Sequence, residues 1–282
     1  MNASPANPDP GLLDRARGCA VGAAIGDALG MPLEARPPRP LNHLLREMVS
    51  GRLPAGSFTD DTEMALALAE SLLARLRRGD PWDVAAEAVQ AMNRESAPNG
   101  SLMRCWPAAL AYWDDPDALL RDSVLQSRVT HVHIDCLAAC AFANTLIAAL
   151  LRGTAPAEAV SEALATVPLP DGLRVVVEGA ASRRREELPN TGWVRHTLES
   201  ALWGLLTTGS FEEALVQVVN LGHDADSAGA VAGALAGAAY GLAAIPARWR
   251  TALCGAWPPR SETFWTADDF AALADRLVGA VA

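Results

Sequence analysis

Glycine recurs at every fourth position in two apolar stretches of this 282-residue chain, and no other feature limits the fold as strongly. Positions four apart lie on nearly one face of a helix, where glycines leave the backbone bare for the close approach of another helix. Each helical glycine costs roughly 1 kcal/mol relative to alanine, so eight of them indicate that close approach matters. The spacing therefore predicts two tightly packed, central helices. The two rows are Gly18, Gly22, Gly26 and Gly30, and Gly229, Gly233, Gly237 and Gly241.

The same spacing occurs where membrane helices pack together, and residues 228–246 carry no charge. Alanine and glycine are only weakly hydrophobic, however. Asp224 and Asp226 border the second row, and Asp27 lies within the first. We therefore expect both rows to belong to central helices of a protein that does not span a membrane.

Composition and patterning together predict an all-α fold. Apolar residues make up 50% of the chain and aromatic residues only 5%, and the strong helix formers alanine and leucine are abundant. Apolar residues recur with the helical period, and no alternating β pattern of useful length occurs. The helices are expected at about 12–29, 60–77, 82–93, 102–112, 117–127, 134–151, 156–165, 172–186, 194–207, 211–219, 226–243, 246–254 and 267–280, with a short amphipathic segment at about 41–49.

The domain organisation is expected to be simple. No linker is long enough to require two domains, so we expect a single compact domain over residues 11–282. Residues 1–10 are polar and proline-rich, and they lack the basic and apolar regions of a signal peptide. They are predicted to form a flexible tail. We expect a monomer.

Charge excludes several classes of function. The formal net charge is -10 and the isoelectric point about 5.0, so the basic surface of a nucleic-acid-binding protein is missing. All 23 basic residues are arginine. Without lysine, Schiff-base chemistry, pyridoxal-phosphate attachment and a P-loop are excluded.

The cysteines indicate the compartment. They are odd in number, lie mostly in apolar helical stretches, and have no histidine or cysteine partner at a zinc-like spacing. We expect buried free thiols, which suit a reducing, cytoplasmic environment. The five residues are Cys19, Cys105, Cys136, Cys140 and Cys254.

Two short acidic phrases stand out, Thr59-Asp60-Asp61 and Asp224-Ala225-Asp226-Ser227. Each combines two carboxylates with a hydroxyl at the start of an alanine-rich helical stretch. If the phrases meet, the four carboxylates must become protonated or hold cations, and oxygen ligands without Cys or His favour Mg²⁺, Mn²⁺ or Ca²⁺ over zinc. Acidic residues also occur at ordinary helix starts, as caps and as partners of the helix dipole. Residue types and spacing alone leave both interpretations open.

Six ordered segments allow a comparison with a known family. The segments are 18–34 (GCAVGAAIGDALGMPLE), 58–73 (FTDDTEMALALAESLL), 99–107 (NGSLMRCWP), 127–133 (SRVTHVH), 191–203 (TGWVRHTLESALW) and 220–241 (NLGHDADSAGAVAGALAGAAYG). In order and spacing they resemble the motifs of the ADP-ribosylglycohydrolase family, which includes dinitrogenase-reductase-activating glycohydrolases and ADP-ribosylarginine and ADP-ribosylserine hydrolases. The resemblance implies a single orthogonal multi-helix domain with two Mg²⁺ or Mn²⁺ ions at its centre. It also implies the metal ligands, namely Thr59, Asp60, Asp61, Asp224, Asp226 and Ser227.

The resemblance further implies the chemistry. Family members cleave the bond between C1″ of the distal ribose of ADP-ribose and a side chain, commonly arginine, through an oxocarbenium-like state. We expect Asp61 and Asp60, as metal-linked carboxylates, and Glu34 to be the catalytic residues. For Glu34 a solvated helix end is the alternative. Some relatives carry a catalytic aspartate just before the Asn99 motif, where Ser96-Ala97-Pro98 offers no acid and Glu95 is nearest.

Substrate-binding positions also follow from the resemblance. The loop that begins at Asn99 is expected to lie against ADP-ribose, with backbone N–H groups suited to a pyrophosphate. Arg104 either adds charge there or forms a structural ion pair. Trp193 either stacks on adenine or packs in the core. The positions expected to bind substrate are Asn99, Gly100, Ser101, Met103, Arg104, His131, Gly192, Trp193, Gly222 and His223.

The function predicted from the sequence is removal of ADP-ribose from modified arginine on a protein, or from a small guanidine compound, by a hydrolase that depends on two Mg²⁺ or Mn²⁺ ions. One alternative is a hydrolase of another conjugate, with ADP-ribose linked to serine, nucleic acid or a small molecule. The other is a catalytically silent protein of the same fold that binds ADP-ribose. The expected partner is an ADP-ribosylated protein or small molecule.

Overall fold

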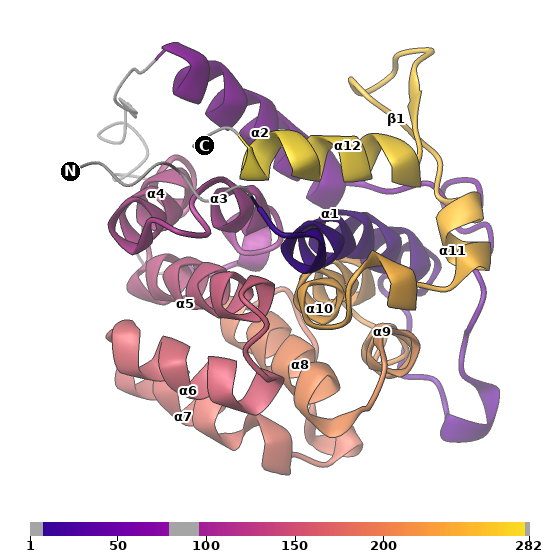
Figure 1. Cartoon of the computed structure of the whole chain (residues 1–282). Coiled ribbons are helices and arrows are strands. Elements are labelled where there is room, and N and C mark those ends of the chain that lie inside the picture. Colours follow the sequence, from indigo (N-terminus) through magenta and orange to yellow (C-terminus); the bar gives the residue numbers. More distant parts are fainter. Residues whose placement is uncertain (1–7, 79–95, 280–282) are drawn as a thin grey trace.

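The two glycine rows form the centre of the molecule. The computed structural model describes residues 8–78 and 96–279. Within them, helices α1 (Pro10–Gly30) and α10 (Ala225–Tyr240) lie side by side, with the other helices around them (Figure 1). Most residues of both helices are fully buried. The prediction of two central helices is confirmed, and the structure adds that they are each other's partners.

The glycines set both the distance and the direction of this pair. A methyl group at Gly18, Gly22 or Gly26 would lie 2.3, 2.3 or 1.9 Å from the carbonyl oxygen of Gly237, Gly233 or Gly229, respectively. The register runs in opposite directions along the two helices, so they are antiparallel and almost in backbone contact. Because of this register, the C-terminal end of α1 lies beside the N-terminal end of α10.

The remaining helices surround the pair. Helices α2 and α12 lie on one side, α5 and α8 lie on the other with α6 and α7 outside them, and α9 and α11 cover the flank (Figure 1). Their bounds are α2 Asp60–Arg78, α3 Trp106–Ala111, α4 Pro116–Arg128, α5 Ile134–Leu151, α6 Pro156–Thr166, α7 Asp171–Gly179, α8 Val194–Thr207, α9 Phe211–Val219, α11 Ala247–Ala252 and α12 Ala267–Val278. Short 3₁₀ turns are η1 Met31–Leu33, η2 Leu41–His43, η3 Asn99–Ser101, η4 Ala180–Ser182, η5 Arg185–Glu187 and η6 Leu242–Ala244.

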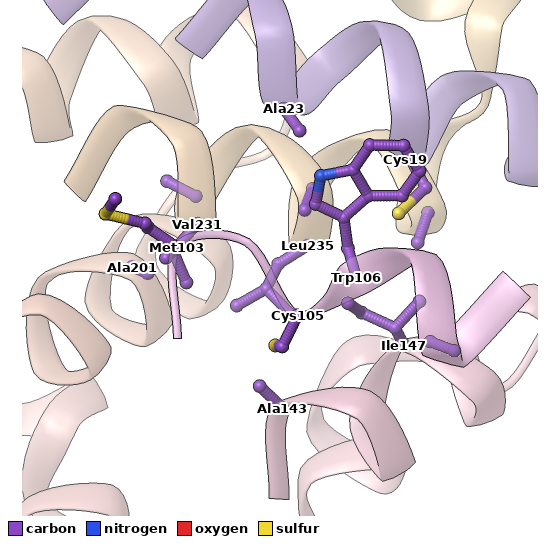
Figure 2. Packing of buried hydrophobic residues seen from close by; sticks show 14 of the residues in the cluster. Cys19, Ala23, Met103, Cys105, Trp106, Ala143, Ile147, Ala201, Val231 and Leu235 are labelled. Carbon is purple, nitrogen blue, oxygen red and sulfur yellow. The ribbon is translucent and has the colours of Figure 1, made fainter. Parts of the chain in front are cut away.

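The hydrophobic core is continuous around the central pair. Trp106, the first residue of α3, lies among side chains of α1, α5 and α10, including Cys19, Ile147 and Leu235 (Figure 2). All four are buried. Every cysteine is a free thiol, and all but Cys254 are buried, as the sequence predicts.

Helix α5 has the length and apolar composition that a membrane span needs. In the structure 89% of it is buried inside the protein, against α4, α6 and α10 among others. Its apolar surface is therefore satisfied by protein contacts, as in a core helix.

The structure differs from the sequence prediction in a few places. The helix expected at 172–186 ends at Gly179 and continues only as the 3₁₀ turns η4 and η5; glycine has the lowest helix propensity after proline. The helix expected at 102–112 begins only at Trp106, where Pro107 suits a first turn. A two-residue hairpin, β1 Gly255–Ala256 with β2 Phe264–Trp265, is an addition to the all-α fold. The helix expected at 82–93 and the residue Glu95 lie outside the described residues.

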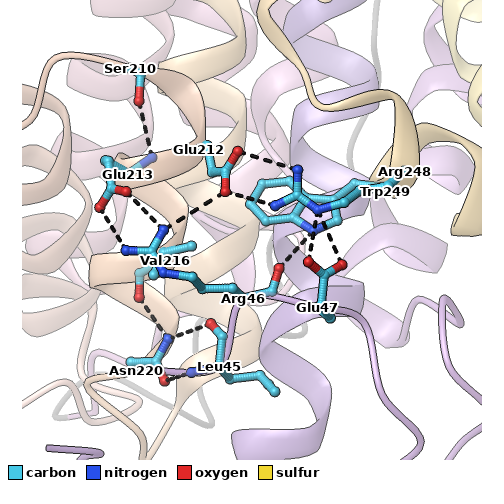
Figure 3. Close-up of polar contacts among 10 residues, drawn as sticks. All are labelled: Leu45, Arg46, Glu47, Ser210, Glu212, Glu213, Val216, Asn220, Arg248 and Trp249. Carbon is cyan, nitrogen blue, oxygen red and sulfur yellow. Dashed lines mark hydrogen bonds and ion pairs between the residues drawn. The ribbon is translucent and has the colours of Figure 1, made fainter. Parts of the chain in front are cut away.

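The short amphipathic segment expected at 41–49 is helical only in η2. Its backbone groups bond elsewhere: Leu45 accepts a hydrogen bond from Asn220 Nδ2 at 2.9 Å and donates one to Asn220 Oδ1 at 2.7 Å. Arg46 pairs with Glu213 at 2.8 Å, and Trp249 Nε1 donates to the Arg46 carbonyl at 3.0 Å (Figure 3). These contacts bind the segment between η1 and α2 to α9 and α11.

Candidate active site

The antiparallel register brings the predicted metal-binding phrases to one end of the central pair. A methyl group at Gly30 would lie 2.6 Å from the Cα atom of Asp226, so the end of α1 touches the start of α10. Glu34 follows α1 after the single turn η1. Helix α2, which opens with Asp60 and Asp61, begins against the same end of α1, through the hydrogen bonds described next.

Asp27 makes the connection between α1 and α2. Its carboxylate Oδ2 accepts hydrogen bonds from the backbone N–H of Thr59 at 2.9 Å, from the backbone N–H of Thr62 at 3.1 Å, and from Thr62 Oγ1 at 2.6 Å. It therefore caps α2 from another helix. Asp27 was not among the site residues expected from the sequence. The sequence did contain a signal for this role, because a single carboxylate within an apolar, glycine-rich helix needs a hydrogen-bond or ionic partner.

The first phrase divides between a buried and an exposed carboxylate. Asp61 is 3% exposed, and its Oδ2 accepts a hydrogen bond from Thr59 Oγ1 at 3.2 Å. Asp61 Oδ1 is buried and has no hydrogen-bond partner among the described residues. Asp60, which precedes Asp61 in the sequence, is exposed.

The second phrase lies opposite the first. Asn99 Nδ2 donates to Asp224 Oδ2, and the Ser227 N–H donates to Asp226 Oδ1 at 3.0 Å. Asp226 packs against the end of α1 at Gly30, and Asp27, about one turn earlier on α1, bonds to Thr59 and Thr62. Both phrases therefore lie at this end of α1. We call Asp27, Asp60, Asp61, Asp224 and Asp226 the acidic cluster.

Burial and mutual repulsion make the cluster costly when it is fully ionised. Burial raises the pKa of Asp61 well above its usual range, and the charges of Asp27 and Asp226 raise it further. Burial, with the charges of Asp27, Glu34 and Asp224, raises the pKa of Asp226 to about 8. Burial raises the pKa of Asp27 to about 6, against hydrogen bonds from Thr62 and Thr59 that lower it. At about 8, the pKa of Asp226 means that this carboxyl binds a proton at neutral pH unless a cation neutralises it.

The carboxylate and hydroxyl oxygens at this site suit a hard divalent cation. Carboxylate and hydroxyl oxygens are the ligands that Mg²⁺ and Mn²⁺ prefer, and the buried unpaired Oδ1 atoms of Asp61 and Asp27 lack the partner that a buried anion needs. In residues 8–78 and 96–279, no three Asp, Glu, His or Cys side chains converge closely enough to enclose an ion. Here Thr59, Asn99 and the Ser227 N–H bond to the carboxylates, so these side chains would have to turn to enclose an ion.

The raised pKa values predict how pH changes stability without metal. A carboxyl whose pKa is higher in the folded than in the unfolded protein favours folding at low pH, and this contribution is lost as pH rises toward the folded value. With folded values of about 6 and about 8 for Asp27 and Asp226, against 3.8 for a free carboxyl, the window is pH 4 to 8. We expect the chelator-treated protein to lose roughly 1 kcal/mol of unfolding free energy per pH unit between pH 5 and 8. Urea denaturation at each pH measures it, and a flat profile would contradict the prediction.

The loop that begins at Asn99 supports the cluster from one side. Asn99 is buried, and its Nδ2 bonds to Thr197 Oγ1 at 2.7 Å as well as to Asp224. Ser101 faces inward and accepts a hydrogen bond from Ser127 Oγ at 2.9 Å. Met103 is buried with its sulfur 3.6 Å from Ser227 Oγ. The predicted substrate contacts of this loop remain predictions; the observed side chains position the acidic residues.

Arg104 has no carboxylate partner in the described part of the chain. Its guanidinium is buried and donates to the Gln126 carbonyl at 3.0 Å and to Thr130 Oγ1 at 2.8 Å. Of the two alternatives for this residue, the structural ion pair has no partner among the described residues, and added charge at the substrate stays a prediction. Burial lowers the pKa of Arg104. Burial of His131, together with the nearby charge of Arg104, lowers the pKa of His131 to about 4.

His131 and Gly100 lie in contact. A methyl group at Gly100 would lie 2.9 Å from the His131 ring, and Thr130 Oγ1 lies 2.7 Å from His131 Nδ1. At a pKa of about 4 the imidazole is neutral at physiological pH. His131 therefore acts there as a neutral hydrogen-bonding group beside the loop.

Trp193 lies at the surface beside the loop. It is 40% exposed, with the His196 ring 4.7 Å away edge-on and the Arg195 guanidinium 4.9 Å from its ring. The alternative of core packing is therefore wrong. Gly192 is exposed, its carbonyl accepts the Asn99 N–H at 3.0 Å, and a methyl group on it would lie 3.6 Å from Asp224.

Gly222 and His223 form the turn before α10. Gly222 has a φ of +68°, and a methyl group there would lie 2.4 Å from the Arg36 carbonyl oxygen, so only glycine fits. His223 is exposed, and its backbone exchanges two hydrogen bonds of 2.7 Å with Ala35 and Arg36. The turn thus ties the chain after Glu34 to the start of α10.

Glu34 lies at the exposed edge of the cluster. Its side chain is 39% exposed, and its Oε2 accepts a hydrogen bond from Arg52 Nε at 2.8 Å. Its charge contributes to the raised pKa of both Asp224 and Asp226. Glu34 is therefore close to the acidic cluster and open to solvent.

Known proteins are similar to this chain in sequence and in fold. The sequence profile described as ADP-ribosylglycohydrolase matches residues 8–282. The chain is 32% identical to "ADP-ribosylarginine hydrolase Tri1" of Serratia proteamaculans (strain 568), over 86% of this chain and 76% of that protein. It is also 32% identical to "ADP-ribosyl-[dinitrogen reductase] glycohydrolase" of Rhodospirillum rubrum, over 86% of this chain and 92% of that protein. A solved "ADP-ribosylglycohydrolase-related protein complex" superposes with a TM-score of 0.80 at 38% identity, covering 96% of this chain and 99% of the other. The chain belongs to the ADP-ribosylglycohydrolase family and is an enzyme of that family.

Proposed function

We propose that this protein is a hydrolase that releases ADP-ribose from ADP-ribosylated arginine, with two Mg²⁺ or Mn²⁺ ions bound by the acidic cluster. The observation that carries the proposal is that both acidic phrases lie at the end of α1, beside the half-exposed Glu34. The arginine linkage is supported by the printed names of relatives at 32% identity, such as the Tri1 protein of Serratia proteamaculans.

The metal ligands proposed are the six oxygen-bearing residues of the phrases. When bound, two divalent cations supply positive charge that orients adjacent ribose hydroxyls. Asn99 holds Asp224 in place, and Asp27 holds the start of α2, so the ligands are positioned by side chains that are themselves buried. The six residues are Thr59, Asp60, Asp61, Asp224, Asp226 and Ser227.

Charge and exposure support the division of roles among the carboxylates. The negative cluster would stabilise positive charge that develops at C1″ as the glycosidic bond breaks. Glu34, which solvent reaches, is placed to exchange a proton with water or with the leaving group. Asp61 is buried against the cluster and suits a metal-linked role.

Trp193 and the turn at Gly192 suit the nucleotide end of the substrate. An exposed indole can stack on adenine, and Gly192 lies close to Asp224, which connects that surface to the cluster. His223 and His131 lie on the two flanking turns. We place the protein in the reducing cytoplasm, which suits its free thiols.

Purified protein supplied with Mg²⁺ or Mn²⁺ is expected to release ADP-ribose from an ADP-ribosyl-arginine peptide, and to do so more slowly from an ADP-ribosyl-serine peptide. Chromatography of free ADP-ribose gives both rates, and a chelator should abolish release. Preferential release from serine would overturn the arginine assignment. If the protein binds ADP-ribose but releases it from neither peptide, it is a silent binding protein and the proposal is wrong.

A further inference from the structure

The side chain of Arg52 reaches into the exposed edge of the acidic cluster. Its Nε donates to Glu34 Oε2 at 2.8 Å, and its Nη2 lies 3.6 Å from Asp226 Oδ2. Among the basic side chains of the described residues, Arg52 is the one that forms an ion pair with Glu34 or the acidic cluster. One guanidinium therefore joins the proposed proton-exchanging residue to a proposed metal ligand.

The backbone that carries Arg52 is fixed on both sides. A methyl group at Gly51 would lie 2.8 Å from the Cα atom of Pro32, so the chain packs directly on the turn after α1. The Gly56 carbonyl accepts a hydrogen bond from the Cys254 N–H at 2.9 Å. The Arg52 side chain itself is 49% exposed. Its contact with Asp226 can therefore form and break by side-chain rotation, without movement of the loop.

The two contacts of Arg52 respond differently to a bound metal. Asp226 is a proposed ligand, and a divalent cation on its carboxylate would repel a guanidinium that lies 3.6 Å from the same oxygen. Glu34 is not among the proposed ligands, so its hydrogen bond with Arg52 can persist. We propose that Arg52 is a built-in competitor of the metal: it contacts Asp226 in the metal-free protein and is displaced from it, while it stays on Glu34, when a divalent cation binds.

This inference rests on the proposed metal site and adds a cost to metal binding. A half-exposed ion pair contributes up to about 1 kcal/mol, which corresponds to a factor of about five in a dissociation constant. Arg52 is therefore expected to weaken metal binding about three- to fivefold. In return it compensates part of the repulsion within the cluster when no metal is bound.

The experiment compares Arg52→Gln with Arg46→Gln as a matched control. Arg46 is 44% exposed and also forms a 2.8 Å ion pair, with Glu213 on α9, away from the acidic cluster. In calorimetric titrations of chelator-treated protein with Mn²⁺, Arg52→Gln should bind about three- to fivefold more tightly than the wild type, and Arg46→Gln should be unchanged. Arg52→Gln should also lower the melting temperature of the metal-free protein, and saturating Mn²⁺ should close that gap.

Arg52→Lys separates the contact from the general effect of charge. Lysine keeps the charge but lacks the fork that bridges two carboxylates, so it should bind Mn²⁺ more tightly than the wild type although less tightly than Arg52→Gln. Equal or weaker Mn²⁺ binding in both Arg52 variants would overturn this inference alone. If Arg52→Gln binds Mn²⁺ more tightly than the wild type and Arg52→Lys does not, the positive charge at this position is responsible rather than the contact with Asp226. The inference is then also wrong. A wild type that binds no Mn²⁺ would overturn the proposed function as well.

Discussion

Asp226→Asn is expected to lower the rate of ADP-ribose release by about a thousandfold or more and, at the same time, to raise the melting temperature of the metal-free protein. Activity falls because a buried ligand oxygen loses the charge that binds a cation. Stability rises because asparagine, unlike Asp226, needs neither a proton nor a cation at this buried position beside other carboxylates. Such opposite changes in activity and stability are typical of a functional carboxylate rather than a helix cap.

Three measurements check this expectation: metal content by mass spectrometry, turnover of ADP-ribosyl-arginine, and the melting temperature with a chelator. The control is Asp275→Asn, which removes a half-exposed carboxylate that pairs with Arg17 at 2.7 Å, far along α12 from the cluster. It should leave activity unchanged and alter the unfolding free energy by less than about 1 kcal/mol. If Asp226→Asn retains both metal and activity, the proposed site is in the wrong place.

Gly26→Ala is expected to destabilise the protein by about 3 kcal/mol or more, although alanine is the better helix former. The added methyl group would lie 1.9 Å from the Gly229 carbonyl oxygen, and that atom belongs to a helix backbone that cannot rotate away. The two central helices would have to separate. For a chain of this size the melting temperature should fall by roughly 6–12 °C.

The same variant should weaken the active site, because the acidic phrases lie at the end of the helix pair that separates. Mn²⁺ affinity and turnover are therefore expected to fall together in Gly26→Ala. Gly179→Ala is the control, since Gly179 ends helix α7 and has no atom within 4 Å of an added methyl group. It should stabilise the protein slightly. A neutral result for Gly26→Ala would show that the central pair tolerates separation.

Local features of the site could be read from the sequence. The helix that opens with Asp60 has the start that its acidic first turn predicts. The motif resemblance selected the family, which the comparisons confirm. Asp27 could not be assigned in this way, because its partners, Thr59 and Thr62, lie more than 30 positions away on another helix. Arg52 was missed for the same reason.

The segment from Glu34 to Phe58 shows where sequence patterns fail. The amphipathic pattern at 41–49 did not predict that the backbone of Leu45 bonds to the side chain of Asn220. A pattern of side chains reports which face is apolar, and it does not report that a distant amide competes for the backbone. This segment nevertheless carries Arg52 to the cluster.

The glycine spacing and the acidic helix starts were enough to predict that two helices approach almost to backbone contact and that two helix starts carry paired carboxylates. Both are local properties, set by a spacing of four residues and by neighbours within one helical turn. That the helices pair with each other, antiparallel, with Gly26 against Gly229, is a property of the folded chain. That register, with the bond from Thr59 to Asp27, brings two phrases 163 positions apart to the same end of α1. The acidic phrases lie together there because of the direction and register of a long-range contact, which the residues of one helix do not specify.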